Sequence, residues 1–105
     1  MYRCILVHPE DQDMQRILWR ENINEPVHEF RLKTITYGTA SASFLATNCL
    51  NVLAEEIADS HPAASLAISK NFYMDDLLTG AESVESAKSL QNVIHTTLEK
   101  AHFPL

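Results

Sequence analysis

The feature that most constrains the fold of this chain is an acidic pair set inside an apolar stretch. Asp75 and Asp76 stand between Phe72-Tyr73-Met74 and Leu77-Leu78. Two carboxylates without partners are too costly to bury, so the chain has to bring them to the surface at this point. Short apolar runs on both sides of a polar break are typical of two strands joined by a turn. The sequence therefore predicts two strands that meet at an acidic turn.

A second pair of strands is predicted near the start of the chain. Residues 15–20 and 27–36 are rich in branched and aromatic side chains, and the second segment alternates loosely with a period of two. The connection between them, ENINEP, has the length of a hairpin loop. We therefore expect a β-hairpin over residues 15–36.

Two segments carry apolar side chains at helical spacing. The first follows Tyr37-Gly38 and ends at His61-Pro62, with its apolar positions at Leu45, Cys49, Val52, Leu53 and Ile57. The second runs from Ser83 to Ala101, and Ser83 is a favourable N-cap. Between them, residues 65–74 return to a period of two and are expected to form a strand. This order predicts an α+β fold of the ferredoxin-like kind, an antiparallel sheet with two helices on one face.

Composition excludes several classes of protein. With 46% apolar and 21% charged residues, the 105-residue chain is typical of a globular domain and not of a disordered tail. Eight basic and fourteen acidic side chains leave a net charge of -6, which is the wrong sign for a freestanding module that neutralises phosphates. No signal peptide or membrane span is found, so we expect no membrane partner.

The acidic pair offers a candidate metal site. Mg²⁺ prefers oxygen ligands and is often held by one or two carboxylates together with substrate phosphates. Asp75 and Asp76 could supply such a pair from the rim of a turn. The structural alternative is equally open from spacing alone, because aspartate is common in turns, where its side chain bonds nearby backbone amides.

Three motifs in order add a family resemblance. FYMDDLLTGA resembles the YxDD motif of reverse transcriptases, and TYGTASASFLA resembles the glycine turn and helix that form the second signature of that family. MYRCILVHPEDQDMQRILWRE resembles the end of the first aspartate motif and the strand after it. Together they are most similar to the polymerase of BEL/Pao-type long-terminal-repeat retrotransposons, and the likeness covers essentially the whole chain.

The resemblance implies a function and a set of catalytic residues. Residues 1–105 would be part of the palm of an RNA-directed DNA polymerase, with residues 15–36 belonging to the fingers. Asp75 would be a direct ligand of the two Mg²⁺ ions used in nucleotidyl transfer, and Asp76 would support it. The partners implied are an RNA or DNA template-primer, a deoxynucleoside triphosphate and the remainder of a retrotransposon polyprotein, inside a cytoplasmic particle.

The resemblance also implies substrate-binding residues. Tyr2 would be the bulky gate that excludes a ribose 2′-hydroxyl by steric clash. Tyr37 and Gly38 would form the turn beside the incoming nucleotide. Met74 would lie near that nucleotide and the primer end, and Tyr73 near the template-primer backbone.

The chain also departs from the family pattern. The first catalytic aspartate of the family lies a few residues before the gate tyrosine, and here that position would precede Met1. Ser43 stands where relatives commonly have proline, and Cys4 where they often have glutamine. Because a two-metal site without a principal ligand cannot hold both ions, we expect the isolated chain to be inactive as a polymerase.

Other functions stay open at this stage. The chain could be a retroelement remnant without activity, or a small nucleic-acid-binding α+β module with exposed sheet aromatics. A phosphoacceptor of the response-regulator kind would require parallel strands separated by helices. The basic side chains of the first hairpin could face a template-primer or simply be solvated; they are Arg16, Arg20, Arg31 and Lys33. Trp19 is expected to pack in the core or on the sheet and not to stack on a base.

Overall fold

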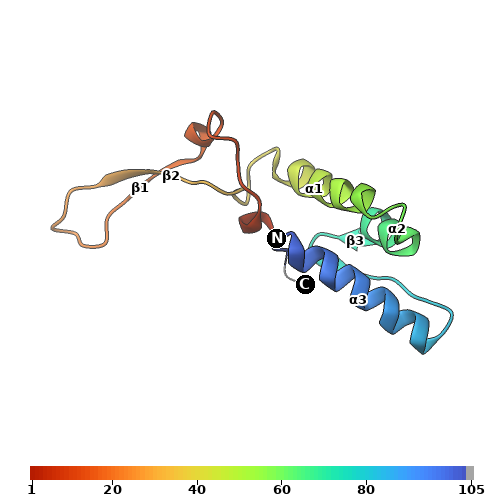
Figure 1. Ribbon diagram of the computed structural model, residues 1–105. Coiled ribbons are helices and arrows are strands. Elements are labelled where there is room, and N and C mark those ends of the chain that lie inside the picture. Colours follow the sequence, from red (N-terminus) through yellow and green to blue (C-terminus); the bar gives the residue numbers. More distant parts are fainter. Residues whose placement is uncertain (104–105) are drawn as a thin grey trace. The chain divides into compact units, whose positions relative to one another are not determined.

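The computed structural model describes residues 1–103 and divides into two compact units. One unit comprises residues 2–42, and the other comprises Met1 together with the chain from Ser43 onward. Figure 1 shows the elements of both units along the chain. Each unit is described separately below.

The unit of residues 2–42 is built around a hairpin. Strand β1 (Arg16–Trp19) pairs antiparallel with strand β2 (His28–Arg31), with Ile17 opposite Phe30 and Trp19 opposite His28 (Figure 1). The predicted hairpin is confirmed, although its strands are shorter than expected and its loop extends over residues 20–27. Two short 3-10 helices precede it, at Tyr2–Cys4 and Gln12–Gln15.

The side chain of Gln15 closes the base of this hairpin. Its amide nitrogen Nε2 donates to the backbone carbonyls of Leu32 (3.3 Å) and Thr34 (3.0 Å), and its Oε1 accepts from the backbone N–H of Thr36 (3.2 Å). On the other side of the same segment, Leu6 forms a β-bridge with Thr34. The chain after β2 is therefore held between Gln15 and the segment around Leu6.

The second unit is mainly helical. It contains α1 (Ala42–Glu56, whose first residue belongs to the other unit), α2 (Pro62–Lys70) and α3 (Val84–Lys100), with a small hairpin of β3 (Phe72–Tyr73) and β4 (Asp76–Leu77) between α2 and α3 (Figure 1). Its buried side chains come from all three helices and from Phe103 after α3. Those on the helices are Ala46, Leu50, Ala54, Ala64, Ala67, Ile68, Ile94 and Leu98.

The prediction that residues 65–74 form a strand is wrong over most of this segment. Residues 62–70 form α2, and only Phe72 and Tyr73 are extended. Pro62 suits the first turn of a helix, and the alanines that follow it have the highest helix propensity of all residues. The buried positions Ala64, Ala67 and Ile68 have helical spacing, whereas Leu66, which the period of two placed inside, is exposed.

The two predicted helices are confirmed with different limits. The first ends at Glu56 instead of continuing to His61, and its buried stripe consists mainly of small residues, with Ala46 and Ala54 inside and Val52 exposed. In α3, the Ser83 hydroxyl accepts a hydrogen bond from the backbone N–H of Ser86 (3.1 Å), which confirms the predicted cap.

The described residues thus form a small mixed α+β fold with three α-helices and two separate two-stranded antiparallel sheets. The sequence predicts one sheet with two helices on one face, and this part of the prediction is not met, because α2 takes the place of a predicted strand. Within residues 1–103, no helix is both long and apolar enough to cross a membrane.

Candidate functional site

The acidic pair lies at a two-residue turn, as the sequence predicted. Phe72 pairs with Leu77 and Tyr73 pairs with Asp76, so Met74 and Asp75 alone connect the strands. Met74 has a φ of 55°, a left-handed backbone that residues other than glycine rarely adopt. Because the strands are antiparallel with no helix between them, this hairpin does not have the topology that a response-regulator phosphoacceptor requires.

Asn71 anchors this hairpin to α2. Its backbone N–H donates to the carbonyl oxygen of Ala67 (2.9 Å), which ends the helix. Its carbonyl accepts from the backbone N–H of Leu78 (3.1 Å), and its side-chain nitrogen Nδ2 donates to Oγ1 of Thr79 (3.0 Å). Asn71, directly before β3, therefore joins the end of α2 to the chain that follows β4.

The two carboxylates border a cavity of about 390 Å³ between the hairpin and α3. The side chain of Asp75 is 66% exposed, and its Oδ1 lies 3.7 Å from the amino group of Met1. Asp76 is also exposed. The cavity has an acidic rim and a mostly apolar wall, lined by Asp75, Asp76, Leu77, Thr79, Gly80, Ala87, Leu90, Gln91 and Ile94.

The side chains at this turn supply part of the ligand set of a hard cation. Two adjacent carboxylates supply oxygen ligands, and Mg²⁺ usually completes its octahedral shell with water and phosphate oxygens. Nowhere in residues 1–103 do three or more histidine, cysteine, aspartate or glutamate side chains gather in a way that could hold a metal ion. At this turn, Asp75 and Asp76 are the carboxylates that could hold such an ion.

The other expected substrate-binding residues fall into two groups. Tyr73 and Met74 directly precede the acidic pair, and both are exposed. The rings of Tyr2 and Tyr37 contact each other in the unit of residues 2–42, with centroids 4.9 Å apart and planes inclined by 42°. Gly38 follows with a φ of 86°, so the predicted glycine turn does adopt a backbone that favours glycine.

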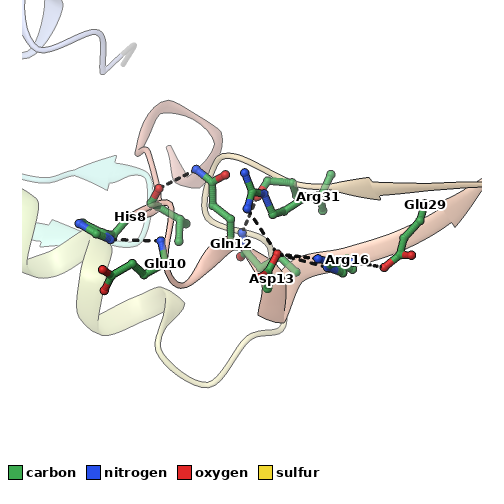
Figure 2. A network of polar contacts seen from close by, with 10 residues as sticks. His8, Glu10, Gln12, Asp13, Arg16, Glu29 and Arg31 are labelled. Atoms are coloured by element: carbon green, nitrogen blue, oxygen red, sulfur yellow. Dashed lines mark hydrogen bonds and ion pairs between the residues drawn. The ribbon is translucent and has the colours of Figure 1, made fainter.

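Two basic side chains of the first hairpin, Arg16 and Arg31, pair with acids (Figure 2). Arg16 bridges Asp13 and Glu29, and Arg31 lies 3.4 Å from the same oxygen of Asp13. The hydrogen bond and charge of Arg16 lower the pKa of Asp13, with a smaller contribution from Arg31. Two of the four basic groups considered as contacts for a template-primer are thus engaged within this unit.

Sequence reasoning did not identify the wall of the cavity at the acidic turn. Gln91 is the polar residue that α3 contributes to it, and Thr79 comes from the chain after β4. The helical spacing of α3 predicts its buried face but carries no information on which loop packs beside it.

Comparison of the chain with protein-family models, with curated proteins and with solved structures gives no match.

Proposed function

We propose that this chain is part of the palm of a reverse transcriptase, in which the turn between β3 and β4 carries two of the carboxylates used in nucleotidyl transfer. The observation that carries the proposal is the two-residue turn that presents Asp75 at its tip, beside Asp76 in the next strand. The order of the three sequence motifs supports it independently. In the finer form of the proposal, β3 and β4 belong to a ferredoxin-like palm sheet.

The residues of the turn have separate roles in this proposal. Asp75 would hold Mg²⁺ directly, since it lies in the two-residue turn itself, and Asp76, the first residue of β4, would support it. When bound, Mg²⁺ would lower the cost of deprotonating a primer hydroxyl and would neutralise the triphosphate of the nucleotide. Tyr73 and Met74 would contact the primer and the incoming base through their exposed side chains.

The proposal also assigns roles to three residues of the unit 2–42. Tyr2 would exclude ribonucleotides by its bulk, while Tyr37 and Gly38 would shape the turn beside the nucleotide. The contact between the two tyrosine rings would hold the gate side chain in place, because tilted aromatic pairs are favourable beyond the area that they bury.

Metal binding at the turn can be measured without enzymatic activity. We expect Mn²⁺, added to the ¹⁵N-labelled chain, to broaden the amide signals of residues 74–77 first, and Mg²⁺ to reverse this. Asp75→Asn should weaken the effect by at least about tenfold, because a carboxylate ligand is lost. The matched control is Asp59→Asn, an exposed aspartate in the turn after α1. The proposal would be contradicted if Mn²⁺ broadened the signals around Asp59 as much as those of residues 74–77, or if it broadened none at the turn.

Polymerase activity needs a separate experiment. We expect the 105-residue chain to extend no primer on an RNA template. The chain joined to the coding sequence upstream of Met1 should show Mg²⁺-dependent extension that Asp75→Asn abolishes and Asp59→Asn leaves intact. The absence of an in-frame aspartate shortly before Tyr2 would leave the remnant interpretation in its place.

A further inference from the structure

The hairpin of β1 and β2 has two chemically different faces. Successive side chains of a strand point to opposite sides, so Ile17, Trp19, His28 and Phe30 share one face. The rings of His28 and Phe30 contact edge to face, with centroids 6.4 Å apart. The salt-bridged side chains of Arg16, Glu29 and Arg31 (Figure 2) lie on the other face, together with the exposed Leu18.

The apolar face has no cover in the described part of the chain. Ile17, Trp19 and Phe30 are 42%, 57% and 48% exposed, although each is of a type usually found inside. Trp19, which the sequence predicted to pack in the core or on the sheet, lies in β1 with its side chain exposed, so the core placement is wrong. Several large apolar side chains on one exposed sheet face are typical of an interaction surface.

The outer edge of β2 is also open along residues 28–31, and the segment 5–7 pairs on this side only further along the chain, at Lys33 and Ile35. The backbone N–H of Leu32 donates to the carbonyl of Gln15 (3.2 Å), which makes these two a hydrogen-bonded pair. Hydrogen-bonded and non-hydrogen-bonded pairs alternate in an antiparallel ladder, so Phe30 and His28 direct their backbone groups toward β1. The N–H and C=O groups of Glu29 and Arg31 therefore point away from the hairpin. Within residues 1–103, no strand pairs with this edge of β2.

The charges on this edge complement a second copy of the same edge. If two β2 strands pair antiparallel about a two-fold axis at Phe30, then Glu29 of each copy lies opposite Arg31 of the other. The outward backbone groups of these two residues then form the hydrogen-bonded pairs, and the two Phe30 side chains meet at a non-hydrogen-bonded position, where side chains are closest. The register shifted to centre on Glu29 would oppose two glutamates, so the charges select one register.

We infer that the chain self-associates through β2, forming a four-stranded antiparallel sheet in which the two copies pair edge to edge about Phe30. This inference does not depend on the proposed function. A nucleic acid strand is the less suitable occupant of the aromatic face, because six acidic and only four basic side chains lie within residues 10–33, which makes the hairpin net negative.

The first test uses two charge variants of the full chain. Glu29→Arg alone would oppose two arginine pairs in the dimer, and Arg31→Glu alone would oppose two glutamate pairs. Each should weaken self-association by at least about tenfold in sedimentation equilibrium, since like charges directly opposite are destabilising. A mixture of the two variants should form a heterodimer, because every arginine then faces a glutamate.

The mixing step separates this interface from a damaged hairpin. Each substitution also removes an ion pair within its own chain, but damage of that kind would not be repaired by adding the other variant. General attraction is excluded as well, because both variants keep a net negative charge. The inference would be overturned if the unmodified chain stayed monomeric up to millimolar concentration. It would also be overturned if the single variants associated as strongly as the unmodified chain.

A second measurement uses only the unmodified chain and covers the case in which a variant fails to fold. In amide hydrogen exchange, the N–H groups of Glu29 and Arg31 should become protected as protein concentration rises. The N–H of Leu18, which points outward from the opposite edge on β1, is the matched control and should exchange at an unchanged rate. Protection of Leu18 alone would overturn the inference, as would binding of a single-stranded oligonucleotide to Trp19 by a chain that remains monomeric.

Discussion

The hydroxyl of Ser65 in α2 donates a hydrogen bond to the backbone carbonyl of Ala54 in α1, over 2.7 Å. Ala54 lies in the last turn of α1, where carbonyl groups have no partner within their own helix. Both residues come from segments that the sequence describes only as apolar or alternating. A single side chain of the second helix therefore completes the end of the first.

Ser65→Ala should lower the free energy of unfolding by about 1 kcal/mol, because the part-buried carbonyl of Ala54 loses its donor. Urea denaturation measures the change. Ser69→Ala is the matched control in the same helix, since the Ser69 hydroxyl bonds only the carbonyl of Leu66 within α2, and it should stay within about 0.5 kcal/mol of the unmodified protein. Equal losses in both variants would show that the bond between the helices has no special role.

Met74→Gly should raise the stability by up to about 1 kcal/mol. The left-handed backbone at Met74 is strained for a residue with a Cβ, and glycine relieves that strain at some cost in chain entropy. Asp75→Gly, one position later and without a positive φ, should instead lower stability by about 0.5–1 kcal/mol. Thermal unfolding of the two variants side by side distinguishes the effects, and a loss in both would argue against strain at Met74.

Leu98→Ala should destabilise the helical unit by about 2–4 kcal/mol, because Leu98 is only 1% exposed and its truncation leaves a cavity. Val84→Ala, on the same helix but 72% exposed, should change stability by less than about 0.5 kcal/mol. Guanidinium titrations followed by circular dichroism provide the comparison. A small effect at Leu98 would mean that α3 is not part of a packed core.

The carboxyl group of Asp13 should titrate below the ordinary pKa of aspartate in an NMR titration, since Arg16 stabilises its charged form. The ion pairs of Asp13 therefore stabilise the hairpin above the ordinary aspartate pKa, and this contribution is lost as the pH falls through the lower folded value. Arg16→Gln should move the midpoint up. Arg20→Gln, whose side chain instead bonds the carbonyl of Glu25, should leave it in place.

Local signals in the sequence predicted the parts of the fold that depend on local chemistry. The cap at Ser83, the hairpin around Trp19 and the acidic turn at Asp75 all follow from residues close together in the chain. The strand prediction for residues 65–74 is wrong because it rests on Leu66 and Ile68 sharing a face at a period of two, whereas α2 buries Ile68 and exposes Leu66. The alanines of this segment and Pro62 at its start favour a helix, because both residue types have a backbone preference that does not depend on the apolar pattern.

The candidate site was predictable only as far as its carboxylates. Asp75 and Asp76 were identified from their neighbours in the chain, but the cavity beside them also needs Leu90 and Gln91 of α3. Which face of a distant helix packs against a turn depends on tertiary contacts that helical spacing does not contain. In the same way, nothing in the spacing of Arg16 and Arg31 showed that a common aspartate, Asp13, would pair with both.

The turn between β3 and β4 also limits which mutations this segment can accept during evolution. Only Met74 and Asp75 connect the paired strands, so the backbone of the turn cannot accommodate an extra residue without a change in pairing. One inserted or deleted residue would shift the register and turn Asp76 to the other side of its strand. The acidic turn can therefore accept a change of residue type far more readily than a change of length, so insertions and deletions in this gene should be sparse here and more frequent in the loop of residues 20–27.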